Sequence, residues 1–138
     1  MRVMGLDVGE KTIGVAVSDP MGWTAQGVKV IRRVGKKKDW SELKRLIDEY
    51  EVETLVIGIP RRTDGSYGPE ADAVRRFGDR TAAHFRIPVE YWDERFSTVA
   101  AERVLLEGDV SRKKRRPVID KVAASIILQS YLDRHSKQ

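Results

Sequence analysis

An aspartate inside the first apolar stretch of the chain is the first candidate for chemistry. Asp7 lies in the run from Val3 to Gly9, whose alternating side chains have the period of a β-strand. An ionised carboxylate in an apolar strand costs free energy unless a cation or hydrogen-bond donors meet it. Gly9 permits a tight turn and leaves the space above Asp7 open. Asp7 is therefore predicted either to bind a ligand or to hydrogen-bond its own turn.

Two further carboxylates, Glu94 and Asp120, follow elements that could place them near Asp7. Glu94 comes directly after an apolar strand, and Asp120 lies in the first turn of a helix whose apolar face includes Ala124. Because ligands bind at the carboxyl ends of the central strands of such sheets, we expect the three acids to meet there. Asp93 competes with Glu94 for the inward position, since alternation alone does not fix where the strand ends. Asp120 could instead complement the helix dipole, and Glu94 could be a surface acid.

Carboxylates that converge in this way require a cation, because they otherwise raise one another's pKa. The chain has no cysteine and only two histidines, so oxygen ligands must dominate any metal site. Mg²⁺ or Mn²⁺ suits such ligands, and two ions about 3.5–4 Å apart can activate water and stabilise the leaving oxygen in phosphodiester hydrolysis. We therefore predict Asp7, Glu94 and Asp120 as metal ligands and catalytic residues.

Basic residues near these acids are candidates for phosphate binding. The net charge is +5, and runs of lysine and arginine fall in predicted loops, which favours a nucleic-acid partner over a solvated surface. Lys11 and Arg95 stand next to the first two acidic segments and could hold phosphates. The predicted substrate-binding residues are Lys11, Arg61, Arg62, Arg95, Arg112, Lys113, Lys114 and Arg115.

The predicted elements describe an α/β protein of one domain, residues 1–138. Three consecutive strands suggest an antiparallel meander, and the later strands alternate with helices. This order predicts a five-stranded mixed sheet with helices on both faces. Strands are expected at 3–9, 13–18, 25–32, 54–60 and 87–93, helices at 39–51, 69–85, 98–107 and 120–134, and a mobile basic loop at 109–117.

The composition excludes several classes of protein. Hydrophobic residues make up 41% and charged residues 34% of the chain, as in a soluble globular protein. The sequence shows no apolar run long enough for a membrane span and no signal peptide. We therefore expect a cytoplasmic protein with no membrane partner.

Four ordered motifs together resemble a known family. They are Gly5-Leu6-Asp7-Val8-Gly9 with 13–19, Val56-Ile57-Gly58-Ile59-Pro60 with Asp64-Gly65, Asp93-Glu94-Arg95 with Ser97-Thr98, and Asp120 with Ala123-Ala124 and Ile127-Leu128. In this order and spacing they resemble the YqgF (RuvX) family of ribonuclease H-like Holliday junction resolvases. The resemblance spans essentially the whole chain.

This resemblance implies a ribonuclease H-like fold and an acidic site made of Asp7, Glu94 and Asp120. It also implies Holliday junction resolution or the end maturation of small-subunit ribosomal RNA precursors. One departure is Thr12, which stands where family members commonly carry arginine, so one phosphate contact is expected to be absent. Relative to RuvC, the strand ending at Pro60 carries no acid, and Glu94 substitutes for it.

Two function classes remain open from the sequence. The first is a metal-dependent nuclease acting on structured RNA or branched DNA. The second is a nucleic-acid-binding module whose acids are too few for efficient catalysis. Sugar-kinase and actin-like ATPases also open with Asp-x-Gly, but they need two such domains and 138 residues supply one. Either a monomer or a homodimer is compatible with the first two classes.

Overall fold

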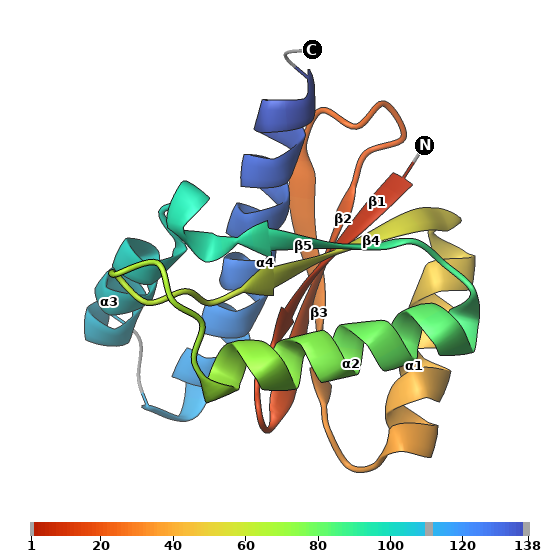
Figure 1. Ribbon diagram of the computed structural model, residues 1–138, viewed down its shortest axis with the longest axis horizontal. Coiled ribbons are helices and arrows are strands. Elements are labelled where there is room, and N and C mark those ends of the chain that lie inside the picture. The colour runs from red at the N-terminus through yellow and green to blue at the C-terminus, as the bar shows by residue number, and fades with distance from the viewer. Residues whose placement is uncertain (1, 110–111, 137–138) are drawn as a thin grey trace.

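The computed structural model contains a five-stranded mixed sheet flanked by helices (Figure 1). It describes residues 2–109 and 112–136, including their side chains except at 104, 106–109, 112–118 and 136. The elements are β1 (Arg2–Val8), β2 (Thr12–Ser18), β3 (Ala25–Arg32), α1 (Lys36–Glu49), β4 (Val52–Ile59), α2 (Pro69–Phe85), β5 (Val89–Asp93), the 3₁₀ turn η1 (Glu94–Phe96), α3 (Val99–Asp109) and α4 (Arg112–Ser136).

The strands lie in the order β3-β2-β1-β4-β5, with β1 at the centre. The strands β1, β2 and β3 are antiparallel, and β4 and β5 run parallel to β1. This confirms the predicted α/β fold with a mixed sheet and an antiparallel meander. The short turn between β1 and β2 is closed by the Gly9 amide, which donates to the Thr12 carbonyl at 2.9 Å.

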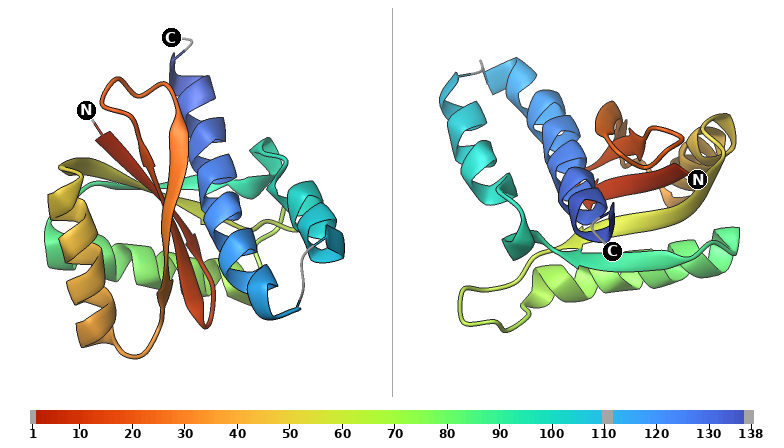
Figure 2. Two further views of the ribbon diagram at one scale, coloured as in Figure 1. Left: turned by 180° about the vertical axis from the view of Figure 1, so that it is seen from behind. Right: turned by 90° about the horizontal axis from the view of Figure 1, so that it is seen from above.

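One face of the sheet packs against α1 and α2, and the opposite face packs against α4 (Figure 2). The alternation along β1 explains this division. Met4 and Leu6 point into the core under α1 and α2, and both are fully buried. Val3, Gly5 and Asp7 have the opposite parity and therefore point toward α4. The prediction of helices on both faces is confirmed.

Glycines on the sheet allow α4 to approach very closely. A methyl group at Gly5 would lie 2.7 Å from the Leu128 Cβ, and one at Gly14 would overlap the Asp120 carbonyl oxygen. A methyl at Gly27 would collide with the Lys121 side chain in the same way. These three glycines lie on adjacent strands, so together they form a shallow seat for the helix. The backbone of α4 thus rests directly on β1, β2 and β3.

Two helices begin earlier than predicted. Helix α1 begins at Lys36, after Gly35, and α4 begins at Arg112, where a basic loop was expected. Lysine and arginine have high helix propensity, which favours an early start in both places, although α4 also continues through Pro117. Asp120 consequently lies in the third turn of α4, not the first. None of the helices within the described ranges is both long and apolar enough for a membrane crossing.

Candidate active site

Asp7 lies on the central strand, at the floor of a cavity of about 1030 Å³. Its Cα is paired with that of Gly14 across the β1–β2 ladder, and the residue is 9% exposed. Burial raises the pKa of the Asp7 carboxyl above 3.8, although the positive charge of Arg103 partly offsets that effect. A buried carboxylate with this shift is poised to gain stability from a nearby cation.

Glu94 reaches the same cavity from η1, the turn that follows β5. Burial raises the pKa of the Glu94 carboxyl above its usual value, with Arg103 again acting in the opposite direction. Asp93 is engaged elsewhere: its carboxylate accepts hydrogen bonds from Arg61 at 3.3 Å and from the Arg95 guanidinium at 3.0 Å. The choice left open by strand alternation is therefore resolved, and Glu94 is the acid that lines the cavity.

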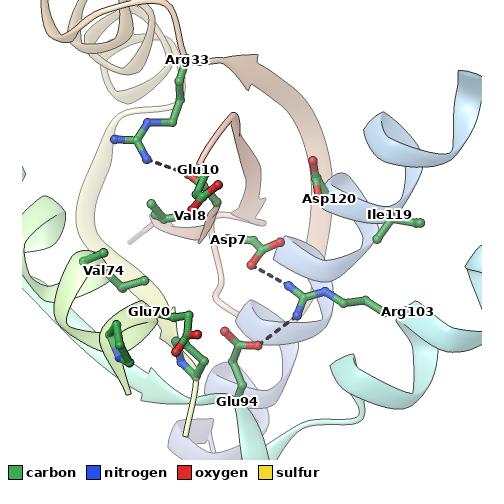
Figure 3. Close-up of a pocket in the computed structure, with 14 residues that line it drawn as sticks. Asp7, Val8, Glu10, Arg33, Glu70, Val74, Glu94, Arg103, Ile119 and Asp120 are labelled. Atoms are coloured by element: carbon green, nitrogen blue, oxygen red, sulfur yellow. Dashed lines mark hydrogen bonds and ion pairs between the residues drawn. The ribbon is translucent and has the colours of Figure 1, made fainter. Parts of the chain in front are cut away.

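Arg103 of α3 joins the two acids, a contact that the sequence reasoning missed (Figure 3). Its Nη2 donates to Asp7 at 2.8 Å and its Nη1 donates to Glu94 at 3.4 Å. Burial acts to lower the pKa of the Arg103 guanidinium, but the charges of Asp7 and Glu94 raise it overall. One sequence signal could have revealed it: Arg103 lies one turn after the buried Val99, on the inward face of α3.

Asp120 lines the cavity from α4 but faces β2. The Thr12 hydroxyl donates to its carboxylate at 2.5 Å, which fixes the orientation of the acid. Thr12, the residue that departs from the pattern of the resembled family, thus has a defined partner in this protein. Asp7, Glu94 and Asp120 line one cavity, yet in the described part of the chain no three acids or histidines are close enough to hold a metal ion.

The predicted phosphate-binding residues lie in different surroundings. Lys11 is exposed at the β1–β2 turn and is not among the residues that line the cavity. Arg61 and Arg95 are both bound to Asp93, whereas Arg62 is exposed. The side chains of Arg112, Lys113, Lys114 and Arg115 lie outside the described residues. The assignment of these residues to substrate binding stays a prediction.

A second arginine absent from the predicted site, Arg33, lines the cavity beside the β1–β2 turn. Its Nη1 donates to the Gly9 carbonyl at 2.6 Å, and its own amide donates to the Lys11 carbonyl at 2.8 Å. The guanidinium also lies over the Phe77 ring, 5.2 Å from its centroid. Three contacts therefore hold Arg33 in place at the cavity, and its hydrogen bond to Gly9 is drawn in Figure 3.

The donor set of the cavity suits a hard divalent cation. Carboxylates are the ligands that Mg²⁺ and Mn²⁺ prefer, and the raised pKa values of Asp7 and Glu94 mark a site where positive charge is favourable. In the structure the guanidinium of Arg103 meets that need. Water activation next to a phosphodiester is the chemistry that such a set of acids supports once a divalent cation is bound.

Comparison with known proteins agrees with these features. A family model described as "RuvX: Holliday junction resolvase" matches residues 1–134. A protein of Clostridioides difficile (strain 630) named "Putative pre-16S rRNA nuclease" is 62% identical over 132 residues, which are 96% of this chain and 94% of the relative. A Moorella thermoacetica protein of the same name is 60% identical over 134 residues, 97% of this chain and 96% of the relative.

A solved structure extends the comparison to the fold. The Thermus thermophilus RuvC in complex with Holliday junction substrate superimposes with a TM-score of 0.57, covering 99% of this chain and 96% of that chain. Its sequence is 13% identical, so the likeness concerns the arrangement of strands and helices. The ribonuclease H-like fold predicted from the sequence is confirmed.

Proposed function

This chain belongs to the RuvX family of Holliday junction resolvases, and we propose from this that it hydrolyses phosphodiester bonds during end processing of the small-subunit ribosomal RNA precursor. The names of the Clostridioides difficile and Moorella thermoacetica relatives support this substrate. The structural observation that carries the proposal is one cavity lined by Asp7, Glu94 and Asp120, which come from three distant segments.

Mg²⁺ or Mn²⁺ is the proposed cofactor, with Asp7, Glu94 and Asp120 as its ligands. The support is the set of carboxylate oxygens and the raised pKa values of the buried Asp7 and the partly buried Glu94, which indicate that ionising these acids is costly without a nearby cation. The cation would supply activation of water and neutralisation of the charge that develops on the phosphate.

The protein's own side chains have separate tasks in this proposal. Thr12 fixes the Asp120 carboxylate, and the sheet fixes Asp7. Arg103 keeps Asp7 and Glu94 from facing each other as bare like charges. If a cation held these acids, the planar guanidinium of Arg103 would be available in the cavity to bind phosphate oxygens through two hydrogen bonds.

The test is cleavage of defined substrates with and without divalent cations. Purified protein is incubated with pre-16S ribosomal RNA and with a four-way DNA junction, beside Asp7→Asn. We expect cleavage of the RNA that requires Mg²⁺ or Mn²⁺ and is lost in Asp7→Asn. Asp19→Asn is the matched control, because Asp19 accepts from the Trp23 and Thr24 amides in a turn away from the cavity. Undiminished cleavage by a folded Asp7→Asn variant would contradict the mechanism.

A second candidate function is a nucleic-acid-binding module without catalysis. The observation in its favour is the double ion pair of Arg103, which engages two of the three acids. Salt-sensitive binding of RNA with no cleavage in any divalent cation is the result that this alternative predicts. Light scattering during the same preparation decides between the proposed monomer and homodimer.

A further inference from the structure

A second, smaller depression of about 230 Å³ lies between α1 and α2, beside the candidate active site. We name it the basic groove, and its defining residues are Arg33, Lys36, Trp40, Arg76, Phe77 and Arg80. Arg33 and Ala73 line both the basic groove and the large cavity, so the two spaces adjoin. A chain lying in the groove would lead directly to the acids.

The two spaces carry opposite charge. Among the residues whose side chains the structure describes, five acids (Asp7, Glu10, Glu70, Glu94 and Asp120) and two arginines (Arg33 and Arg103) line the large cavity. The basic groove is lined by four cations and one acid, Asp39. Asp39 is 6% exposed, and its carboxylate accepts from the Val34 amide at 3.0 Å. The described cations of the basic groove therefore attract a polyanion.

The cations of the groove are available to a ligand. Lys36, Arg76 and Arg80 are exposed, and none of them forms an ion pair within the part of the chain that the structure describes. By contrast, Arg45 on the same α1 helix is bound to Glu42 at 2.9 Å. Free, exposed cations in a concave surface are typical of phosphate binding.

The spacing of the groove fits a short run of nucleotides. Ala73, Arg76 and Arg80 follow one another at helical spacing on one side of α2, over a length of about 10 Å at ~1.5 Å per residue. A row of cations of this length can contact only a short stretch of one phosphate backbone.

We propose that the basic groove holds the sugar-phosphate backbone of a short single-stranded segment next to the bond to be cut. This proposal rests on the proposed function, because it takes RNA as the substrate. It adds a binding site outside the acidic cavity and gives the strand a direction of approach. Arg33, fixed at the junction by Gly9 and Phe77, is the residue that contacts the strand where it passes from groove to cavity.

The experiment measures binding separately from cleavage. Fluorescence anisotropy is recorded in EDTA with a blunt RNA hairpin and with the same hairpin carrying a single-stranded overhang at either end. The variant is Arg76→Gln with Arg80→Gln. The matched control is Lys37→Gln with Arg86→Gln, which removes two exposed charges that lie outside the groove and form no ion pair within the described residues.

We expect the groove variant to bind an overhang hairpin about tenfold more weakly, with its salt slope reduced by about 1.4 for two lost single-strand contacts. The control should stay within about twofold of the unmodified protein, and the blunt hairpin should be unaffected by either change. Equal binding by groove variant and unmodified protein overturns the proposal, as does equal weakening for the blunt hairpin. This assay measures binding only, so its outcome is independent of the cleavage assay. A protein that binds overhangs through the groove but shows no cleavage in that other assay would contradict the proposed function and leave the groove proposal standing.

Discussion

Arg103 of α3 donates a hydrogen bond to Asp7 of β1 at 2.8 Å, across 96 positions of sequence. The same guanidinium reaches the partly buried Glu94 at 3.4 Å, so one cation is shared by two acids. This ion pair bears on two requirements of an acidic catalytic site. The acids must converge for chemistry, and they must also be tolerated by the folded protein before any divalent cation arrives.

Replacing Arg103 by methionine tests this balance. Without the guanidinium, Asp7 and Glu94 face each other uncompensated, and we expect stability in EDTA to fall by about 1–3 kcal/mol. Mg²⁺ should restore more stability to this variant than to the unmodified protein, because the acids are then free to bind it. Chemical denaturation with and without Mg²⁺ measures both effects. Arg95→Met, whose partner is Asp93, is the control and should show no such gain from Mg²⁺.

The Asp7 carboxyl predicts an unusual dependence of stability on pH. Because burial raises its pKa above 3.8, the folded protein binds this proton more tightly than the unfolded chain. The stabilisation that comes from binding this proton is fully present below pH 3.8, and it is lost as the pH rises through the raised pKa of Asp7. In EDTA, Asp7→Asn should therefore be more stable than the unmodified protein at pH 7, with the difference closing in acid. A less stable variant at pH 7 would refute this.

Asp93 should behave in the opposite way. Its burial acts to raise the pKa, but hydrogen bonds from Arg95 and Arg61 outweigh burial and hold the pKa below 3.8. The stability from these bonds is present above 3.8 and is lost as the pH falls through the lowered pKa. Asp93→Asn should cost about 1–3 kcal/mol at pH 7. Unfolding curves at pH 7 and pH 3 measure this cost, which should shrink in acid; a constant cost would count against the ion pairs.

Gly14→Ala tests the close seat of α4 on the sheet. The added methyl would overlap the Asp120 carbonyl oxygen, so the helix must move away from β2. We expect the free energy of unfolding to fall by about 1–3 kcal/mol. Cleavage should also be impaired, because Asp120 moves with its helix. Gly9→Ala is a milder comparison, since its methyl would lie 3.2 Å from the Thr12 carbonyl oxygen. Thermal unfolding measures the stability of both variants, and equal values would show that α4 is not closely packed against Gly14.

The sheet could be predicted from sequence because its signals are local. Alternation along β1 and β2, and the continuous apolar run of β4, each reflect the faces that a strand buries. The first residues of α1 and α4 were harder to predict from sequence. The lysines before Asp39 and the basic run at Arg112 are common both in loops and in helices.

Part of the candidate site could also be predicted from local sequence patterns. Asp7 and Glu94 stand at strand ends, where position along the chain indicates position in space. For Arg103, the helical spacing after Val99 indicates only that the side chain faces inward, whereas its contact with Asp7 depends on how α3 lies relative to β1. The Thr12–Asp120 hydrogen bond likewise joins residues 108 positions apart and becomes visible only in three dimensions.

The position of α4 as the last helix has a consequence for synthesis of the protein. The ribosome releases β1 first, so Asp7 emerges long before Asp120 and before the helix that covers its face of the sheet. A nascent chain therefore carries an incomplete cavity until α4 has docked on Gly5 and Gly14. For an enzyme proposed to cut ribosomal RNA, we expect this order of assembly to keep the unfinished chain inactive beside the ribosome that makes it.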